Sequence, residues 1–281
     1  MEYRHSGGQT EIVAGAEFDI GHTFECGQCF RWNRVGDNEY VGVAMGRAAR
    51  VRGGGGTVSV TCADADFEDV WRRYFDLDFD YGTARRALCV DAYMDSAASF
   101  GAGIRILRQD KWEALCSFII SQCNNIPRIK TIVETMCRCF GDRIEFEGRE
   151  LYGFPPPERL ASLSEGDLSP LRCGYRAPYI ISAARAVAGG AADLEALSRA
   201  SSAEALRSLK ALPGVGDKVA NCVALFGFHM LDVFPVDTWM KRVIKERYGG
   251  KLDPAIFGGY AGLAQQYMFF HARSLEHNQR P

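Results

Sequence analysis

The 281-residue sequence contains no apolar run long enough to cross a membrane. It opens with the polar residues Met-Glu-Tyr-Arg-His, and no secretion signal is expected. These two absences argue against the membrane-spanning and secreted classes, so we expect a cytoplasmic protein. No internal repeat is evident.

Motifs for metals and nucleotides are also missing. Cys26 and Cys29 form the only CxxC pair, and no second pair at zinc spacing or flanking histidine accompanies them. The five histidines show no spacing typical of metal ligands. The glycine run Gly53–Gly56 is not followed by a helix with Lys-Ser or Lys-Thr, so it predicts a surface turn and not a phosphate loop. A metabolic enzyme built on a metal or a nucleotide would need such a motif.

Hydrophobic residues are plentiful, at 47%, which predicts a well-packed protein of one large or two smaller domains. Ten cysteines are many for a chain of this length. Six lie in apolar stretches that we interpret as helices, and we expect them to be reduced and buried. These six are Cys89, Cys116, Cys123, Cys137, Cys139 and Cys222.

Charge is balanced overall, with a formal net charge of −2, and does not by itself indicate a nucleic-acid partner. Its distribution is uneven. Residues 1–100 hold 10 Lys and Arg against 16 Asp and Glu, whereas residues 101–281 hold 23 against 19. The small basic excess therefore lies in the C-terminal part of the chain.

The hydrophobic pattern predicts an α+β fold. Residues 1–95 indicate an antiparallel β-rich domain, with strands at Tyr40–Met45, Ala49–Arg52 and Thr57–Thr61. A helix is expected at Asp66–Phe75, where apolar residues recur on one face. Residues 96–281 are expected to be mostly α-helical and to contain a helix-hairpin-helix at about residues 203–228.

The hairpin is the most distinctive stretch. Residues 212–218 read Leu-Pro-Gly-Val-Gly-Asp-Lys and run directly into an apolar helix. Gly214 and Gly216 permit unusual backbone angles and close approach, and Asp217 suits the first turn of a helix. The N–H groups of Gly214, Val215 and Gly216 would then bind a nucleic-acid backbone without reading bases.

Two charged residues stand at predicted helix starts. Lys218 lies in the first turn after the hairpin, where a cation is disfavoured by the helix dipole. Asp237, in Pro-Val-Asp-Thr, is a natural N-cap for a helix over Trp239–Arg247. Taken singly, they have ordinary interpretations as a solvated lysine and a capping aspartate. As a pair they could converge on one cleft.

Leu-Pro-Gly-Val-Gly-x-Lys followed by Pro-Val-Asp resembles the helix-hairpin-helix DNA glycosylases, and more narrowly the 8-oxoguanine DNA glycosylases. The resemblance implies that Lys218 attacks the sugar carbon bearing the damaged base and that Asp237 assists. It also implies that the protein acts on double-stranded DNA that contains oxidised guanine. We expect a monomer, in the cytoplasm or nucleoid of a prokaryote or in the nucleus of a eukaryote. No cofactor is expected, and no iron–sulfur cluster, because no cysteine follows Cys222.

The same resemblance implies a base pocket. In the segment Gly27–Trp32, which reads Gly-Gln-Cys-Phe-Arg-Trp, the Gly27 carbonyl would accept a hydrogen bond from N7–H, which guanine lacks. Gln265 would bind the pyrimidine-ring edge of the flipped base, and Phe269 and Cys222 would cover its two faces. Pro235 is expected in the same pocket. On residue type alone, Gly27 could simply begin a strand, and Phe269 and Cys222 could be ordinary core.

The resemblance further places a set of residues against the base left without its partner, or against the gap in the duplex. This set is Asn124, Arg128, Tyr175 and Arg176. Plain alternatives are turn and cap asparagines, a surface arginine and a loop aromatic residue. Two positions depart from the pattern: Cys123 replaces an asparagine, and Trp239 replaces a histidine that touches DNA in animal relatives.

Two other functions stay open at this stage. A related glycosylase could remove another base, such as an alkylated purine, with the aspartate and water alone. A non-catalytic DNA-binding protein could use the hairpin alone, but it would need neither the Lys218–Asp237 pair nor the Gly27 turn. We expect no metal bound by side chains, although a monovalent cation could bind the hairpin backbone.

Overall fold

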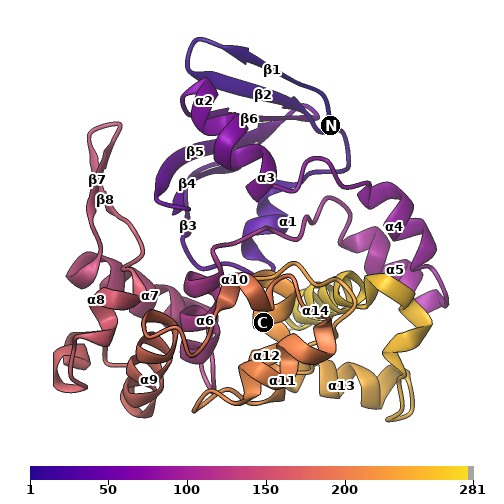
Figure 1. Ribbon diagram of the computed structural model, residues 1–281. Helices are drawn as coiled ribbons and strands as arrows, with labels where there is room; N and C mark the ends of the chain where they lie inside the picture. The colour runs from indigo at the N-terminus through magenta and orange to yellow at the C-terminus, as the bar shows by residue number, and fades with distance from the viewer. Residues whose placement is uncertain (278–281) are drawn as a thin grey trace.

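The computed structural model describes residues 1–277 and has a sheet layer above a larger helical part (Figure 1). Six antiparallel strands form the sheet in the order β1-β2-β6-β5-β4-β3. They span Tyr3–Ser6 (β1), Gln9–Val13 (β2), Trp32–Gly36 (β3), Glu39–Ala44 (β4), Arg47–Gly54 (β5) and Thr57–Thr61 (β6). The three predicted strands are confirmed, except that β4 stops before Met45, which lies in a turn with φ of +52°.

The sheet forms because its strands alternate in polarity. In β6, Val58 and Val60 are buried while the intervening residues are half-buried. The predicted helix after β6 is confirmed as a continuous helical run from Asp64 to Tyr74, which contains a π-helical turn at Phe67–Trp71. Its Trp71 ring packs edge-on against Trp32 of β3, with ring centroids 5.8 Å apart.

Helices dominate the rest of the chain, and the predicted α+β class is confirmed. Within the sheet region, α1 spans Ile20–Glu25. The longer helices after it are α4 (Tyr81–Ala87), α5 (Ala92–Phe100), α6 (Lys111–Ile120), α7 (Ile126–Phe140), α9 (Ala177–Ala188), α11 (Ser202–Lys210), α12 (Asp217–Phe226), α13 (Thr238–Arg247) and α14 (Ala261–His277). Short helices form α2 (Asp64–Asp66), α3 (Arg72–Tyr74), α8 (Pro157–Ala161) and α10 (Leu194–Leu197). The predicted helix-hairpin-helix is α11 and α12.

A second, two-stranded sheet interrupts the helical part and projects from it (Figure 1). Strands β7 (Arg143–Phe146) and β8 (Arg149–Tyr152) pair antiparallel across a two-residue turn. Glu147 and Gly148 in that turn have φ of +49° and +71°, which suits the twist of a tight hairpin. The sequence does not predict these strands, because each is only four residues long and is too short for its pattern to stand out.

A buried polar cluster joins the sheet layer to the helical part. The Asp76 carboxylate, just after α3, accepts hydrogen bonds from Arg108 Nε (2.6 Å) and the Tyr81 hydroxyl (2.9 Å), and lies 3.1 Å from His229 Nε2. Burial by itself would raise the pKa of Asp76, but His229 and Arg108 outweigh burial, and the pKa is lowered. The cluster therefore fixes the loop after α12 against the end of α3.

The expectation that six helical cysteines are buried is wrong for half of them. Cys116, Cys137 and Cys222 are buried, whereas Cys89, Cys123 and Cys139 are exposed. Cys89 and Cys123 lie just beyond the ends of α4 and α6, where helical periodicity no longer predicts burial. All ten thiols are free.

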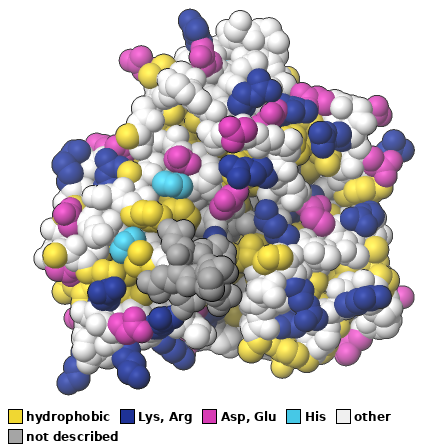
Figure 2. Space-filling view, turned by 180° about the vertical axis from the view of Figure 1, so that it is seen from behind, with side chains coloured by type: hydrophobic (Ala, Val, Ile, Leu, Met, Phe, Trp, Pro, Cys, Tyr) yellow, Lys and Arg dark blue, Asp and Glu magenta, His cyan; other side chains and the backbone are white. Residues whose placement is uncertain are grey.

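No helix within residues 1–277 is both long enough and apolar enough to span a bilayer. The face turned away from the viewer in Figure 1 carries Lys and Arg side chains interspersed with Asp and Glu (Figure 2). Basic residues on this face form no single stripe, which agrees with the balanced charge of the sequence.

Candidate active site

The hairpin between α11 and α12 requires glycine at one position and presents free N–H groups at another. Gly214 has φ of +79°, and a Cβ atom there would lie 2.3 Å from Cγ of Tyr179. Gly216 is the N-cap of α12, and no side chain caps the first N–H groups of this helix. Val215 between them is buried, and its N–H already donates to the Leu212 carbonyl at 3.1 Å, so it is not available as predicted. The N–H groups at the start of α12 can donate backbone hydrogen bonds to a phosphate.

We expect Gly214→Ala to lower the free energy of unfolding by roughly 3 kcal/mol, because alanine is strained at positive φ and its methyl group overlaps the Tyr179 ring. Gly216→Ala is the matched control, since a Cβ there meets no atom within 4 Å. Gly216→Ala should lower the free energy of unfolding by no more than about 1 kcal/mol. It should still weaken binding to duplex DNA, because its methyl group adds bulk beside the N–H groups at the start of α12. Urea unfolding and DNA titration measure both, and equal stability of the two variants would contradict this account.

A cleft of about 1130 Å³ opens between the hairpin, the turn after α6 and helix α14. It brings together residues that are far apart in the sequence, such as Glu25 and Arg273, which are separated by 248 positions. Of the predicted site residues it is lined by Gly27, Asn124, Gly216, Lys218, Cys222, Pro235, Asp237, Gln265 and Phe269. Arg128, Tyr175, Arg176, Gly214 and Val215 do not line it.

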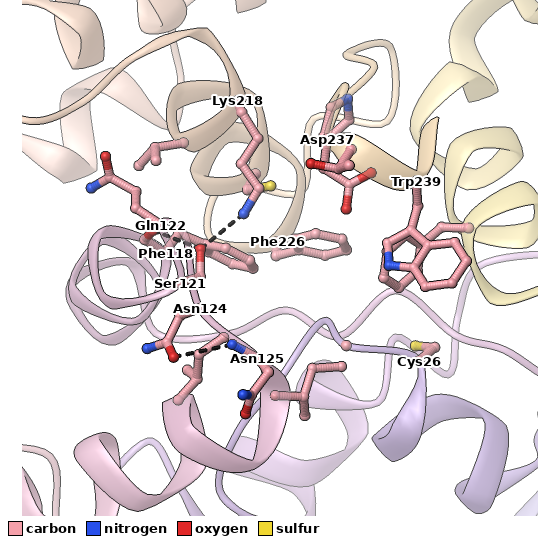
Figure 3. Close-up of a pocket in the computed structure, with 18 of the residues that line it drawn as sticks. Cys26, Phe118, Ser121, Gln122, Asn124, Asn125, Lys218, Phe226, Asp237 and Trp239 are labelled. Carbon is pink, nitrogen blue, oxygen red and sulfur yellow. Dashed lines mark hydrogen bonds between the residues drawn. The ribbon is translucent and has the colours of Figure 1, made fainter. Parts of the chain in front are cut away.

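Lys218 points into the cleft from the first turn of α12 (Figure 3). Its Nζ donates a hydrogen bond to Oγ of Ser121 (2.8 Å) and lies 5.4 Å from the centroid of the Phe118 ring. The Ser121 hydroxyl in turn donates to the Phe118 carbonyl. No carboxylate of the described residues forms an ion pair with this ammonium. Neutral groups, the Ser121 hydroxyl and the Cys222 thiol, therefore hold Lys218, which leaves it able to turn toward a substrate.

Asp237 faces the same cleft from the start of α13 (Figure 3). Its Oδ1 accepts a hydrogen bond from the Met240 N–H at 2.9 Å, so the predicted N-cap is confirmed. Burial raises the pKa of the Asp237 carboxyl group, and the Met240 N–H and the charge of Lys218 offset part of this rise. The lysine and the aspartate thus influence each other electrostatically without touching.

The pocket beyond Lys218 has a polar group at its edge and apolar groups on its sides, which suits a flat ligand with a polar edge. Gln265 is 5% exposed, and its Oε1 has no hydrogen-bond partner within residues 1–277. A buried acceptor without a partner is costly unless a ligand supplies the donor. Burial raises the pKa of the Cys222 thiol to about 11, so this thiol stays neutral and acts as an apolar surface. Phe269, one helical turn after Gln265, lines the same space.

Gly27 lies opposite Phe269 with φ of +85°. A Cβ atom there would lie 3.3 Å from both Phe269 Cε1 and Ile126 Cδ1. Neighbouring Gln28 is fully buried and donates from Nε2 to the Arg105 carbonyl, at 2.8 Å. Glycine is therefore needed here for its backbone angle and for close approach to the pocket.

Arg176, in the short helical turn Gly174–Arg176 before α9, was expected to contact the opposite strand, and the structure largely buries it. Arg176 is 5% exposed, and its guanidinium donates to the carbonyls of Gln122, Cys123 and Cys173. All of these partners belong to the protein, so the guanidinium of Arg176 braces the turn after α6, and its contact with DNA stays a prediction. Sequence alone could not reveal that its donors point inward.

The other members of this set remain accessible. Tyr175 is 53% exposed and stands beside Arg176, whose guanidinium carbon lies 4.4 Å from its ring centroid. Arg128 is exposed, and its Nη2 donates to the Arg172 carbonyl at 3.3 Å. Asn124 donates to the Ile120 carbonyl, which fixes its side chain at the end of α6.

Three residues of the site were not predicted from the sequence: Ser121, which binds Lys218, and Gln266 and Arg273 on α14. Ser121 closes an apolar run and resembles an ordinary helix end. The signals for the other two are weak: Gln266 directly follows Gln265, and Arg273 lies one helical turn after Phe269. Over residues 1–277, no three of His, Cys, Asp and Glu are grouped so as to hold a metal ion.

Comparison with known proteins agrees with this fold and this site. The 8-oxoguanine DNA glycosylase N-terminal domain family matches residues 12–115, and the HhH-GPD superfamily of base excision DNA repair proteins matches residues 116–255. The N-glycosylase/DNA lyase OGG1 of Arabidopsis thaliana is 31% identical over 280 residues, covering 90% of this chain and 77% of that protein.

Two solved structures extend the comparison to three dimensions. MBOgg1 in complex with a low-affinity DNA ligand is 41% identical, with a TM-score of 0.93 over 98% of this chain and 100% of the other. The Clostridium acetobutylicum 8-oxoguanine glycosylase/lyase, in complex with double-stranded DNA containing cytosine opposite 8-oxoguanine, is 33% identical, with a TM-score of 0.93 over 98% and 99%.

A helix-hairpin-helix beside a cleft that holds a lysine and an aspartate defines the class of base-excision DNA glycosylases. Within that class, the chain belongs to the 8-oxoguanine DNA glycosylase family, whose named relatives are N-glycosylase/DNA lyases.

Proposed function

We propose that this protein removes 8-oxoguanine from duplex DNA, where it lies opposite cytosine, and then cleaves the strand at the abasic site. The proposal rests on the surroundings of Lys218. No acidic group contacts its ammonium, and Oε1 of Gln265 in the same cleft has no hydrogen-bond partner within residues 1–277. A glycosylase that used only water and an aspartate would not need that lysine.

The reaction begins with the damaged nucleotide turned out of the duplex, since its glycosidic carbon is unreachable within the stack. The ammonium of Lys218 first loses a proton, and the resulting neutral amine attacks the sugar carbon that bears the base. The glycosidic bond breaks, and the base leaves with the bonding electron pair and gains a proton. Asp237 stabilises the positive charge that develops on the sugar.

The covalent amine then opens the sugar ring and becomes a Schiff base with loss of the ring C–O bond. A proton leaves the neighbouring sugar carbon, and the 3′ phosphate departs by β-elimination, which nicks the strand. Lysine and aspartate supply all of this chemistry, so we propose that no cofactor is required. One chain provides the whole cleft, which supports action as a monomer.

Borohydride trapping tests the proposal. The substrate is a duplex with one 8-oxoguanine opposite cytosine, and reduction should yield a covalent protein–DNA adduct whose peptide map places the link at Lys218. Base release without an adduct would instead indicate a glycosylase that uses water. The absence of both would overturn the assignment of 8-oxoguanine as substrate.

A further inference from the structure

The turn that carries Gly27 is held by a pattern of hydrogen bonds that leaves a single carbonyl without a partner. Arg273 Nη2 donates to the Glu25 carbonyl at 2.6 Å, and Gln266 Nε2 donates to the Cys26 carbonyl at 2.8 Å. On the other side, Gln109 Nε2 donates to the Gln28 carbonyl at 2.7 Å. Three of four successive carbonyls are thus bound by side chains from distant parts of the chain.

The carbonyl of Gly27 is the exception. Within residues 1–277 no N–H or O–H donates to it, although Gly27 lines the cleft. Gly27 is half-buried, and a carbonyl left open in a pocket is suited to accept a hydrogen bond from a ligand. Because its neighbours on both sides are held, this carbonyl has little freedom to turn away.

Two of the three donors come from α14, the helix that also carries Gln265 and Phe269. Gln266 is 2% exposed, and the Arg273 guanidinium carbon lies 5.8 Å from the centroid of the Phe269 ring. The acceptor at Gly27, the acceptor at Gln265 and the ring of Phe269 are therefore tied to one rigid helix. Moving the Gly27 turn away from α14 would break the buried hydrogen bond from Gln266 and the more exposed one from Arg273.

We infer that Gln266 and Arg273 are positioning residues that lock the Gly27 carbonyl in place to read the N7–H of the oxidised base. This inference rests on the proposed function, since it assumes that the base enters this pocket. Neither residue needs to touch the DNA. They act by holding the carbonyls of Glu25 and Cys26, which directly precede Gly27.

The test compares Gln266→Met and Arg273→Met, which keep apolar bulk and remove the donor. Single-turnover excision of 8-oxoguanine should fall roughly tenfold in each, the effect expected from one misplaced hydrogen bond. Nicking of a duplex that already contains an abasic site should stay at the wild-type rate, because no base occupies the pocket. The preference in affinity for an 8-oxoguanine duplex over an undamaged one should also fall roughly tenfold.

Arg159→Met is the matched control, because Arg159 also donates to a backbone carbonyl, that of Phe140 at 2.7 Å, and does not line the cleft. It should leave excision, nicking and preference unchanged. The inference is overturned if the two α14 variants excise at the wild-type rate, or if excision and abasic nicking fall together. Failure of the proposed function itself looks different, since the wild-type protein would then not excise 8-oxoguanine.

Discussion

Lys218→Gln is expected to lower the rates of base excision and of abasic-site nicking by on the order of 10³-fold or more, while duplex binding stays near the wild-type level. Both reactions pass through a bond to the same nitrogen, so one substitution should abolish both. Glutamine is an uncharged polar residue only one bond shorter than lysine, so the substitution removes the amine with little change in local packing. Single-turnover rates on an 8-oxoguanine duplex and on an abasic duplex measure the two losses.

Lys245→Gln provides the matched control, because Lys245 is exposed on α13 and does not line the cleft. Its rates should equal those of the wild type. If Lys218→Gln still excised the base at the wild-type rate but had lost nicking, the lysine would serve only the second reaction, and water would be the nucleophile for the first.

Much of the catalytic cleft was predictable because its signals are local. Lys218 and Asp237 each occupy a helix start, and a helix start is among the clearest features of a sequence. Gly27 was identified on a resemblance, and its φ of +85° supplies a physical reason for glycine there. The strands of the large sheet were equally predictable, because strands such as β6 alternate in polarity along their length.

What sequence could not provide depends on contacts between distant segments. Arg273 and Glu25 are 248 positions apart, and Arg176 reaches the Gln122 carbonyl from 54 positions away. An arginine that binds a backbone carbonyl and one that faces DNA look identical in a sequence. Cys123 shows the same limit, because it follows an apolar helix yet lies in an exposed turn.

Asp237 fills two roles, and two substitutions should separate them. Asparagine is as good an N-cap as aspartate, so Asp237→Asn should keep the Met240 contact and the stability of α13 while losing the charge. Excision should fall by roughly 10²- to 10³-fold. Asp237→Ala should lose comparable activity and also about 1 kcal/mol of unfolding free energy. Urea unfolding and single-turnover excision measure the two effects, and equal activity of Asp237→Asn and wild type would refute the electrostatic role.

The pH dependence offers a sharper test of the same residue, because activity and the contribution of Asp237 to stability should move in opposite directions. Burial raises the pKa of Asp237 above the value of about 3.9 typical of the unfolded chain. The folded protein therefore binds more protons between these two pKa values, and the contribution of Asp237 to stability decreases as pH rises through that window. Excision needs the carboxylate and increases over the same window. In Asp237→Asn both dependences should vanish, and a wild-type acid limb that persisted in this variant would assign the titration to another group.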